Sequence, residues 1–334
     1  MSDDSRRSFF RSMFGSALAA SMAQQAMAQR DSANGIPTRR LGRTNEQVSI
    51  VCLGGWNIGA VENKDEAIKI MHTAIDEGMT FFDNAWDYHD GGSEEIMGRA
   101  LVEPSRRDKV FLMTKNCERT YDGSMSNLDD SLRRMKTDRI DLWQFHEMCY
   151  DNDPDWVFDK GGLKAALEAQ KAGKVRYIGF TGHKDPRIHR KMLEKPYDWA
   201  TAQMPINVMD AHYRSFQREV VPVCLTKDVG VIGMKGLGGG APPKILADTD
   251  FTYEECRQFS LSLPISSLVC GIMSMKELKD AINVARNFKP LGADETARMV
   301  AKAASEGSDG RHELFKSSQV YDGPHHRKQH GFAV

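Results

Sequence analysis

Eight short apolar runs recur along this chain, and each is followed by a polar loop and then by a helical pattern. The runs are rich in β-branched and aromatic residues, which predicts buried strands. They begin at Val48, Thr80, Lys109, Ile140, Val175, Trp199, Val229 and Ser267. Intervening stretches, such as those from Lys64, Gly162 and Met275, repeat apolar residues about every 3.6 positions and predict helices, two of which end at Gly78 and Gly173. Eight strands that alternate with eight helices at intervals of roughly thirty residues predict an α/β fold, a closed (β/α)8 barrel of the TIM type.

A doubly wound open sheet is the alternative α/β architecture. Its dinucleotide-binding form would place a GxGxxG motif directly after the first strand, and none is found there. The glycine-rich stretch Gly236–Gly240 follows the seventh strand instead. The barrel is therefore the preferred prediction, and it spans residues 38–288.

Two further segments flank the predicted barrel. Residues 29–37 form a polar, glycine-bearing linker, and residues 289–334 form a C-terminal extension that begins with a helical pattern and is expected to pack outside the barrel. The sequence HHRKQH, residues 325–330, offers imidazoles to a metal ion. Because no fixed acid or cysteine accompanies it in the sequence, a solvated tail is the preferred interpretation and no metal is predicted.

The first 28 residues differ in composition from the rest of the chain. The arginine pair Arg6 and Arg7 precedes two phenylalanines, an uncharged run rich in alanine, serine and methionine follows from Ser12, and Ala26–Ala28 has a small-x-small pattern. This order is typical of a bacterial twin-arginine signal peptide and predicts periplasmic export through the twin-arginine machinery. The alternative is a cytoplasmic protein with a basic N-terminus. No stretch approaches about 18 consecutive apolar residues, so no membrane span is expected.

The charge balance narrows the class of partner. The formal net charge of -1 provides no basic surface for nucleic acid and favours a small-molecule substrate. The six cysteines have irregular spacings and no CxxC pair, so they are expected as buried free thiols, although an exported protein would permit disulfides. The sequence does not indicate an oligomeric state.

Four polar residues stand at or just after the ends of three successive predicted strands. Asp83 and Tyr88 follow the second strand, Lys115 ends the third and His146 ends the fourth. Catalytic groups of such a barrel lie at the carboxyl ends of its strands, so these side chains are expected to converge. A lysine cation favours ionisation of a neighbouring tyrosine, a carboxylate can pair the lysine, and a histidine can direct a hydrogen bond to the same substrate oxygen. The set predicts a proton donor for a carbonyl oxygen, and a nicotinamide cofactor would bring the hydride.

Several segments, in this order, resemble the aldo-keto reductase family. They are Arg39 to Gly59, Phe81 to Leu101, Lys109 to Lys115, Asp141 to His146, Ala172 to His183 and Ser266 to Ile282, and the similarity covers about residues 38–288. The resemblance implies that Tyr88 is the general acid/base and that Lys115 lowers its pKa. It also implies that Asp83 pairs Lys115, that His146 orients the carbonyl, and that NAD(P)(H) lies extended over the barrel mouth without a Rossmann domain.

The resemblance further implies where the ligands contact the chain. The implied cofactor contacts are Gly55, Trp56, Asp83, Thr181, Gly182, His183, Gln203, Met234, Lys235, Gly236, Leu237, Gly239, Gly271, Ile272, Met273, Glu277 and Asp280. Gln203 matches the family glutamine that hydrogen-bonds the nicotinamide amide. The substrate pocket is expected at Trp56, Trp86, Tyr88 and His146.

The sequence departs from the family pattern at the nicotinamide end of the predicted site. Thr181 and Gly182, followed by His183, replace the Ser-Asn pair that holds the carboxamide in many members. Met234 and Lys235 stand where many members have a tyrosine that stacks on the nicotinamide. His183 is expected to replace the lost amide contact, and Lys235 is expected to reach the pyrophosphate.

A third departure bears on the choice between NAD and NADP. Glu277 stands where the family often has an arginine that pairs the 2′-phosphate of NADP. A carboxylate repels a phosphate and accepts from a ribose hydroxyl, which favours NAD. Lys276 and Lys279 flank Glu277, so the choice stays open.

These features predict an enzyme that reversibly reduces an aldehyde or ketone, with a sugar-like carbonyl favoured for an exported protein. One alternative is an isomerase or epimerase that uses the same four residues and a tightly bound, internally recycled nicotinamide. A second is a non-enzymatic redox-sensing subunit. An exported reductase is expected to carry its cofactor with it, since a soluble nicotinamide pool is not expected outside the cytoplasm.

Overall fold

Eight parallel strands close into a barrel, which confirms the fold predicted from the sequence. The computed structural model describes residues 35–240 and 242–333. The barrel strands are β3 (Val51–Leu53), β4 (Phe81–Asp83), β5 (Phe111–Asn116), β6 (Ile140–Phe145), β7 (Val175–Thr181), β8 (Thr201–Pro205), β9 (Gly230–Met234) and β10 (Ser267–Cys270). β10 pairs with both β3 and β9, which closes the ring. The predicted twin-arginine signal lies outside the described residues.

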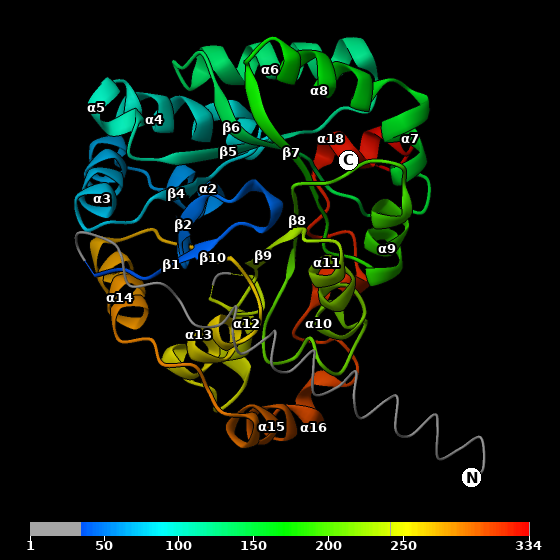
Figure 1. The fold of residues 1–334 in the computed structure, drawn as a ribbon. Coiled ribbons are helices and arrows are strands. Elements are labelled where there is room, and N and C mark those ends of the chain that lie inside the picture. Colours follow the sequence, from blue (N-terminus) through cyan, green and yellow to red (C-terminus); the bar gives the residue numbers. More distant parts are fainter. Residues whose placement is uncertain (1–34, 241, 334) are drawn as a thin grey trace.

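Helices surround the barrel, as Figure 1 shows. They are α2 (Gly55–Gly59), α3 (Lys64–Asp76), α4 (Gly92–Leu101), α5 (Pro104–Arg107), α6 (Tyr121–Arg134), α7 (Asp153–Asp159), α8 (Gly162–Lys171), α9 (Pro186–Glu194), α10 (Phe216–Glu219), α11 (Val221–Thr226), α12 (Lys244–Asp248), α13 (Tyr253–Ser262) and α14 (Met275–Arg286). The helices predicted from Lys64, Gly162 and Met275 are therefore confirmed. Gly78 and Gly173, which follow α3 and α8, have φ of 92° and 75°, the left-handed conformation that glycine adopts at helix ends.

A short hairpin closes the amino end of the barrel. The run from Val48 was predicted as one strand, and this is wrong because the chain bends at Ile50. Its first part belongs to β2 (Gln47–Ser49), which pairs antiparallel with β1 (Thr38–Arg40), and the short 3-10 helix η1 (Gly42–Thr44) joins the two. The bend directs Val48, together with Leu41, into an apolar cluster with side chains that line the barrel interior.

Apolar packing fills the barrel interior at this end and leaves the carboxyl end for polar groups. The interior cluster includes Phe81, Phe111 and Leu142, and the rings of Phe81 and Phe111 meet edge to face at 5.3 Å. A larger cluster joins the outer faces of the strands to the helices. It includes Ile36, so the folded unit begins within the segment predicted as a linker.

The six cysteines are all free and buried, which confirms the sequence prediction. Within the described part of the chain, no helix is both long enough and apolar enough to cross a membrane.

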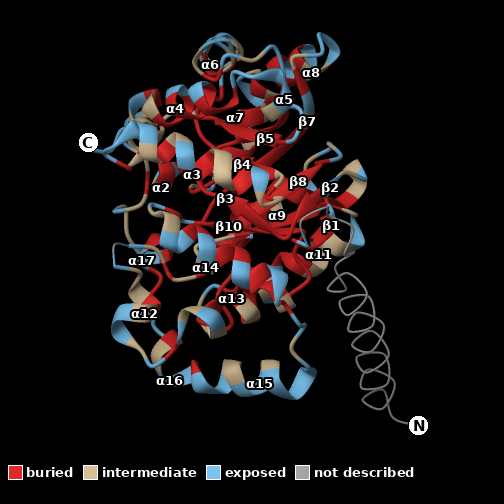
Figure 2. Cartoon of the chain, turned by 90° about the vertical axis from the view of Figure 1, so that its left-hand side faces the viewer, coloured by how far each residue is buried: buried red, intermediate tan, exposed pale blue. Residues whose placement is uncertain are grey.

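The C-terminal extension lies only partly outside the barrel. Its first helices, α15 (Ala293–Lys302) and α16 (Ala304–Gly307), lie at the periphery, as predicted. The segment that follows contains α17 (Leu314–Ser317) and α18 (Pro324–Gln329) and contacts the loops after β4 to β9. In Figure 2, α17 and the C-terminus lie on the side of the molecule opposite to β1 and β2.

The prediction of a solvated tail for residues 325–330 is wrong. The imidazoles of His326 and His330 are almost fully buried, with 4% and 5% of their side chains exposed. They pack against Asp153, a fixed acid that adjacency in the sequence could not reveal because it lies more than 170 residues away.

Candidate active site

The four predicted catalytic side chains converge at the carboxyl end of the barrel. Asp83 ends β4, Lys115 lies in β5 and His146 directly follows β6. Tyr88 begins the 3-10 helix η2 (Tyr88–Gly91), which follows the β4 loop. The structure therefore brings together groups that span more than sixty residues of sequence.

Lys115 connects the other members of this group. Its Nζ donates to Asp83 Oδ1 at 2.5 Å, to the Asn84 carbonyl at 2.7 Å and to the Tyr88 hydroxyl at 3.2 Å. The lysine side chain is 1% exposed and the aspartate side chain 4%. A buried lysine is costly unless it is paired, so Asp83 stabilises the cation that contacts the tyrosine.

The loop after β4 places Tyr88 by backbone geometry. The Trp86 amide donates to the Lys115 carbonyl at 3.2 Å, and the Tyr88 amide donates to the Ala85 carbonyl at 3.2 Å, which turns the chain back toward β5. His89 and Asp90 then both adopt a left-handed φ of 54°. Consecutive left-handed residues are uncommon outside glycine, and strain of this kind concentrates at functional sites.

Tyr88 is held in its protonated form. Burial raises the pKa of its hydroxyl well above the usual value, and the carboxylates of Asp83, Asp87 and Glu147 add to the rise. The net shift of the Tyr88 pKa in the free protein is therefore upward, and the lowering effect of Lys115 stays a prediction. A protonated phenol with a lysine N–H beside its oxygen retains a proton to donate at neutral pH.

Asp87 contacts His146, and sequence reasoning missed this residue. Its Oδ1 lies 3.2 Å from His146 Nδ1, and Cys117 Sγ lies 3.4 Å from the same nitrogen. Burial lowers the pKa of His146, and Asp87 opposes this effect. Burial also opposes ionisation of Asp87, yet His146 holds the pKa of the carboxyl below its usual range. The position of Asp87 directly before Tyr88 is the sequence feature from which it could have been predicted as a site residue.

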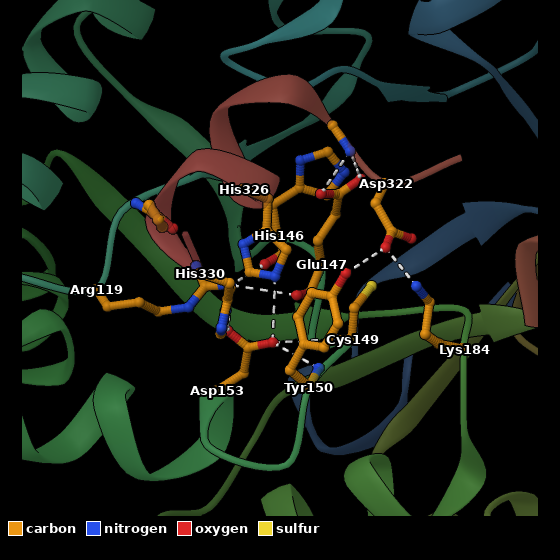
Figure 3. A network of polar contacts seen from close by, with 12 residues as sticks. Arg119, His146, Glu147, Cys149, Tyr150, Asp153, Lys184, Asp322, His326 and His330 are labelled. Atoms are coloured by element: carbon orange, nitrogen blue, oxygen red, sulfur yellow. Dashed lines mark hydrogen bonds and ion pairs between the residues drawn. The ribbon is translucent and has the colours of Figure 1, made fainter. Parts of the chain in front are cut away.

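The C-terminal extension reaches the same site through Tyr321, Asp322 and Gly323, here called the covering segment. The Gly323 amide donates to both oxygens of Glu147, at 2.9 and 3.0 Å. Glu147 is buried, and burial together with Asp87 raises its pKa to about 8. Asp322 is fully buried, forms an ion pair with Lys184 and accepts from the Tyr150 hydroxyl at 2.7 Å. Figure 3 shows the contacts of Asp322 with Lys184 and Tyr150.

The residues predicted to hold the nicotinamide end lie together after β7 and β8. Thr181 ends β7, Gly182 and His183 follow it, and Gln203 lies in β8, where its carbonyl accepts from the Gly182 amide at 3.3 Å. Gln203 is 1% exposed, and among the described residues its Oε1 has no hydrogen-bond partner. A buried amide oxygen without a partner fits a ligand N–H such as that of a carboxamide. His183 Nε2 contacts Asp322 Oδ1 at 3.2 Å, so the covering segment occupies one expected contact.

The loop after β9 also contacts the covering segment. Lys235, with a φ of 53°, follows Met234, and its Nζ lies over the Tyr321 ring at 4.8 Å. Burial lowers the pKa of Lys235 to about 8. Gly236 and Leu237 follow, and Gly239 packs against the Tyr321 ring, where an added Cβ would lie 3.2 Å from a ring carbon.

The remaining predicted cofactor residues lie after β3 and β10. Gly55 begins α2, where a Cβ would come within 2.4 Å of the Asp83 carbonyl, so this position must be glycine for the strands to pack. Gly271, Ile272 and Met273 follow β10. Glu277 lies in the first turn of α14, and its Oε2 accepts from the Met273 amide at 2.7 Å.

Because of Lys276 and Lys279, which flank Glu277, the sequence does not exclude NADP as the cofactor. Lys276 forms an ion pair with Asp280 at 2.7 Å, on the same exposed face of α14. The four side chains Asp83, Tyr88, Lys115 and His146, here called the tetrad, lie at the barrel mouth, where Tyr88 is half-buried and the other three are buried. Glu277, Lys276 and Asp280 instead lie near the solvent-exposed start of α14.

Three of the four residues predicted for the substrate pocket lie next to one another, since the Tyr88 ring contacts both Trp56 and His146. Trp56 is 55% exposed, and its ring meets Tyr88 edge to face at 5.4 Å. Trp86 instead lines a cavity of about 590 Å³ beside the β4 loop. The other lining residues are Asp87, Asp90, Arg134, Pro324, His325 and Lys328. Asp87 lines this cavity and also contacts His146, which links the cavity to the tetrad.

Comparison with known proteins gives one family and a consistent fold. Residues 50–263 match the aldo/keto reductase family. The chain is 29% identical over 61% of its length to aldo-keto reductase yakc [NADP(+)] of Schizosaccharomyces pombe, and 32% identical over 45% of its length to 6-dehydroglucose reductase of Novosphingobium aromaticivorans. These alignments cover 62% and 53% of the relatives, so the chain spans less than two thirds of either. An aldo-keto reductase structure from Bacillus halodurans, in its holo form, superposes with a TM-score of 0.67 at 24% identity, covering 83% of this chain and 99% of that one.

Proposed function

Because the chain belongs to the aldo/keto reductase family, we propose that it is an NAD(P)(H)-dependent oxidoreductase that reversibly reduces an aldehyde or ketone. The observation that carries this proposal is the position of Lys115 Nζ, which contacts the buried Asp83 carboxylate and the Tyr88 hydroxyl at once. This arrangement holds a proton and a cation at one point of the barrel mouth. It contains the parts needed to protonate a carbonyl oxygen.

Each residue of the tetrad has a role that follows from its contacts. Tyr88 donates its proton to the substrate oxygen as charge develops there, and Lys115 stabilises the resulting phenolate through its N–H. Asp83 keeps the buried Lys115 charged. His146, held by Asp87 at Nδ1, directs Nε2 toward the substrate oxygen. In the reverse direction the same tyrosine accepts the proton of an alcohol.

The described residues fit a nicotinamide cofactor, which would supply the hydride when bound. Gln203, with its unpaired buried Oε1, would hold the carboxamide. Lys235 would bind the pyrophosphate, and His183 would replace the missing family contact. Glu277 at the start of α14 favours NAD over NADP, and comparing the dissociation constants of NADH and NADPH tests this preference.

A polyhydroxy carbonyl compound of the sugar type is the substrate class that the site supports best. The cavity beside Asp87 is lined by the Trp86 ring and by the carboxylates of Asp87 and Asp90. The cations Arg134 and Lys328 also line it, and Arg134 lies over the Trp86 ring at 5.3 Å. Aromatic faces pack against sugar rings and carboxylates accept from hydroxyl groups. The name of the relative 6-dehydroglucose reductase agrees with this class.

Replacement of the proton donor tests the proposal. Tyr88→Phe removes the hydroxyl and keeps the ring, so we expect NAD(P)H-dependent carbonyl reduction to fall by about a hundredfold or more while nucleotide binding persists. Tyr121→Phe, which alters an exposed tyrosine bonded to Glu168, is the matched control. Full reductase activity of Tyr88→Phe would reject the assigned acid, whereas a biological activity that persists in this variant without carbonyl reduction would favour a non-enzymatic redox-sensing role.

The covering segment favours a second candidate, an isomerase or epimerase with a retained cofactor. Asp322 contacts His183 and Tyr321 lies over Lys235, so cofactor exchange requires this segment to move. Slow exchange suits a reaction in which the hydride returns to the same substrate. Isomerised product without net consumption of NAD(P)H would identify this activity, whereas stoichiometric consumption would identify the reductase.

Export remains a proposal, based on the sequence of the first 28 residues. A twin-arginine signal would carry the folded protein to the periplasm together with its cofactor. Replacing Arg6 and Arg7 by lysine in the full chain is expected to leave the protein in the cytoplasm, as measured by cell fractionation. Unchanged fractionation would contradict twin-arginine export.

A further inference from the structure

His326 of the C-terminal helix α18, His330 directly after this helix and the buried Asp153 form a cluster outside the tetrad. His326 Nε2 lies 3.2 Å from Asp153 Oδ2, and His330 Nε2 lies 3.1 Å from Asp153 Oδ1. One ligand atom from each residue lies within 4.8 Å of the others. Figure 3 shows His326 and His330 against Asp153. We propose that these three side chains form a binding site for a divalent transition metal ion of the zinc type.

The spacing of the three groups suits metal coordination. Zinc binds histidine nitrogen and carboxylate oxygen at about 2.0–2.2 Å, so neighbouring ligand atoms of a tetrahedral site lie roughly 3.3–3.5 Å apart. His326 Nε2 and His330 Nε2 lie 3.2 and 3.1 Å from different oxygens of Asp153, just below this range, and one ligand atom from each residue lies within 4.8 Å of the others. Without a metal, each ring can donate Nε2–H to the carboxylate, and metal binding would replace these two hydrogen bonds by coordination.

The secondary structure also suits a chelate. His326 and His330 are separated by four positions at the end of α18, which places both rings on one face of the helix. Three protein ligands leave a fourth tetrahedral position for water, as in open zinc sites.

The surrounding contacts fix the ligands in place. The amides of Cys149 and Tyr150 donate to Asp153 Oδ2 at 2.9 and 2.8 Å and set the orientation of the carboxylate. The His330 ring stacks on Trp156, with centroids 4.5 Å apart and planes at 13°. Partners of this kind orient the ligands in metal sites.

Arg119 limits the affinity of the site. Its Nη2 lies 3.4 Å from Asp153 Oδ1, and its shorter bonds go to the His146 and Glu147 carbonyls, at 2.6 and 3.2 Å. A fixed positive charge opposes a cation, so we expect weaker binding than at an isolated site of the same ligands. These contacts fit a structural site that binds its metal with moderate affinity better than a site that is permanently occupied.

Metal binding would link two distant parts of the chain. Asp153 begins α7 in the loop after β6, whereas α18 directly follows the covering segment. A metal held by both would fix α18 on this loop and thereby hold Asp322 and Gly323 over the barrel mouth. The site would thus stabilise the covered form of the molecule.

The neighbouring histidine, His325, provides a matched control. His325 is in the same helix, but its Nε2 contacts Glu118 Oε1 at 2.9 Å and is turned away from Asp153. His330→Phe removes one ligand and keeps a ring against Trp156, so this variant is expected to fold. His325→Phe makes the same chemical change outside the proposed site.

The experiment titrates Co²⁺ and Zn²⁺ into the chelator-treated full chain, with calorimetry and the visible absorption of Co²⁺ as readouts. We expect one ion per chain for the wild type and His325→Phe, and an affinity lower by more than about tenfold for His330→Phe. Zinc should also raise the thermal midpoint of the first two proteins and leave that of His330→Phe unchanged. Absent binding, equal binding by all three, or loss of binding in His325→Phe alone would each overturn the proposal. If His330→Phe is unfolded by circular dichroism, His326→Asn is measured in its place by the same criteria.

Discussion

At the scale of single residues, the site differs from a simple tetrad by its additional acids. Asp87, Glu147 and Asp322 place three carboxylates around the two bases His146 and His183. Asp87 contacts His146 and Asp322 contacts His183, whereas burial opposes the ionisation of Glu147. The protonation state of each group therefore depends on its neighbours across the barrel mouth. The pH dependence of the enzyme should therefore report on residues outside the tetrad.

Asp87 is predicted to set the protonation of His146. Its carboxylate opposes the effect of burial and raises the pKa of the imidazole, so Asp87→Asn should lower that pKa. We expect the limb of the kcat/KM profile governed by His146 to move to lower pH. Asp90→Asn, which changes an exposed acid of the same cavity, should leave the profile in place. An unshifted limb in Asp87→Asn would show that the contact does not control the histidine.

Lys235 is predicted to make cofactor binding pH-dependent. Burial lowers its pKa to about 8 in the free protein, and a bound pyrophosphate would stabilise the charged form and raise it. The lysine is charged below this pH and loses its charge above it, so the dissociation constant should increase from about pH 8 upward. Fluorescence titration of NADH from pH 6 to 9.5 measures this change. Lys235→Arg keeps its charge and should give a flatter profile, and a parallel rise in both proteins would assign the effect to another group.

At the scale of elements, a buried ion cluster fixes the C-terminal extension to the barrel. Lys316 of α17 donates to Asp210 Oδ1 at 2.7 Å and to Glu313 Oε2 at 2.9 Å, and all three side chains are 0% exposed. The Tyr213 carbonyl accepts a third bond at 2.8 Å. The ammonium group thus connects α17 to the loop after β8. This connection positions the covering segment, which follows α17 in the chain.

Removing this lysine is predicted to destabilise the fold. Lys316→Met leaves Asp210 and Glu313 buried without their cation, which typically costs about 3–5 kcal/mol. Part of the loss should be recovered at low pH, because burial already raises the pKa of Glu313 to about 7 and protonation removes its charge. Urea unfolding at pH 5.5 and 8 measures both effects. Lys302→Met, which breaks a half-exposed pair with Glu255, should cost less than about 1 kcal/mol, and equal losses in the two variants would contradict a special role for the buried cluster.

At the scale of the whole molecule, local patterns predicted the barrel and its tetrad, while contacts from distant segments were not predictable. The strand ends place Asp83, Lys115 and His146 by topology alone, since parallel strands in a barrel present their carboxyl ends on one side. The extension could not be placed in this way. Its contacts with the barrel, such as Asp322 with His183, join residues 139 positions apart. No periodicity in residues 289–334 indicates such partners.

The covering segment is predicted to act as a gate for the cofactor. Tyr321 lies over Lys235 and Asp322 lies against His183, so a nucleotide that uses these residues can enter or leave only when the segment moves. The double variant Tyr321→Ala/Asp322→Ala removes both contacts, and we expect nucleotide dissociation to accelerate by about tenfold, equivalent to a barrier lower by about 1.4 kcal/mol. Stopped-flow displacement of bound NADH measures the rate. Val320→Ala, at a side chain that is 77% exposed, is the control for a change in the same loop. If the double variant releases nucleotide at the wild-type rate, cofactor exchange does not depend on this segment, and slow release would have to arise within the barrel itself.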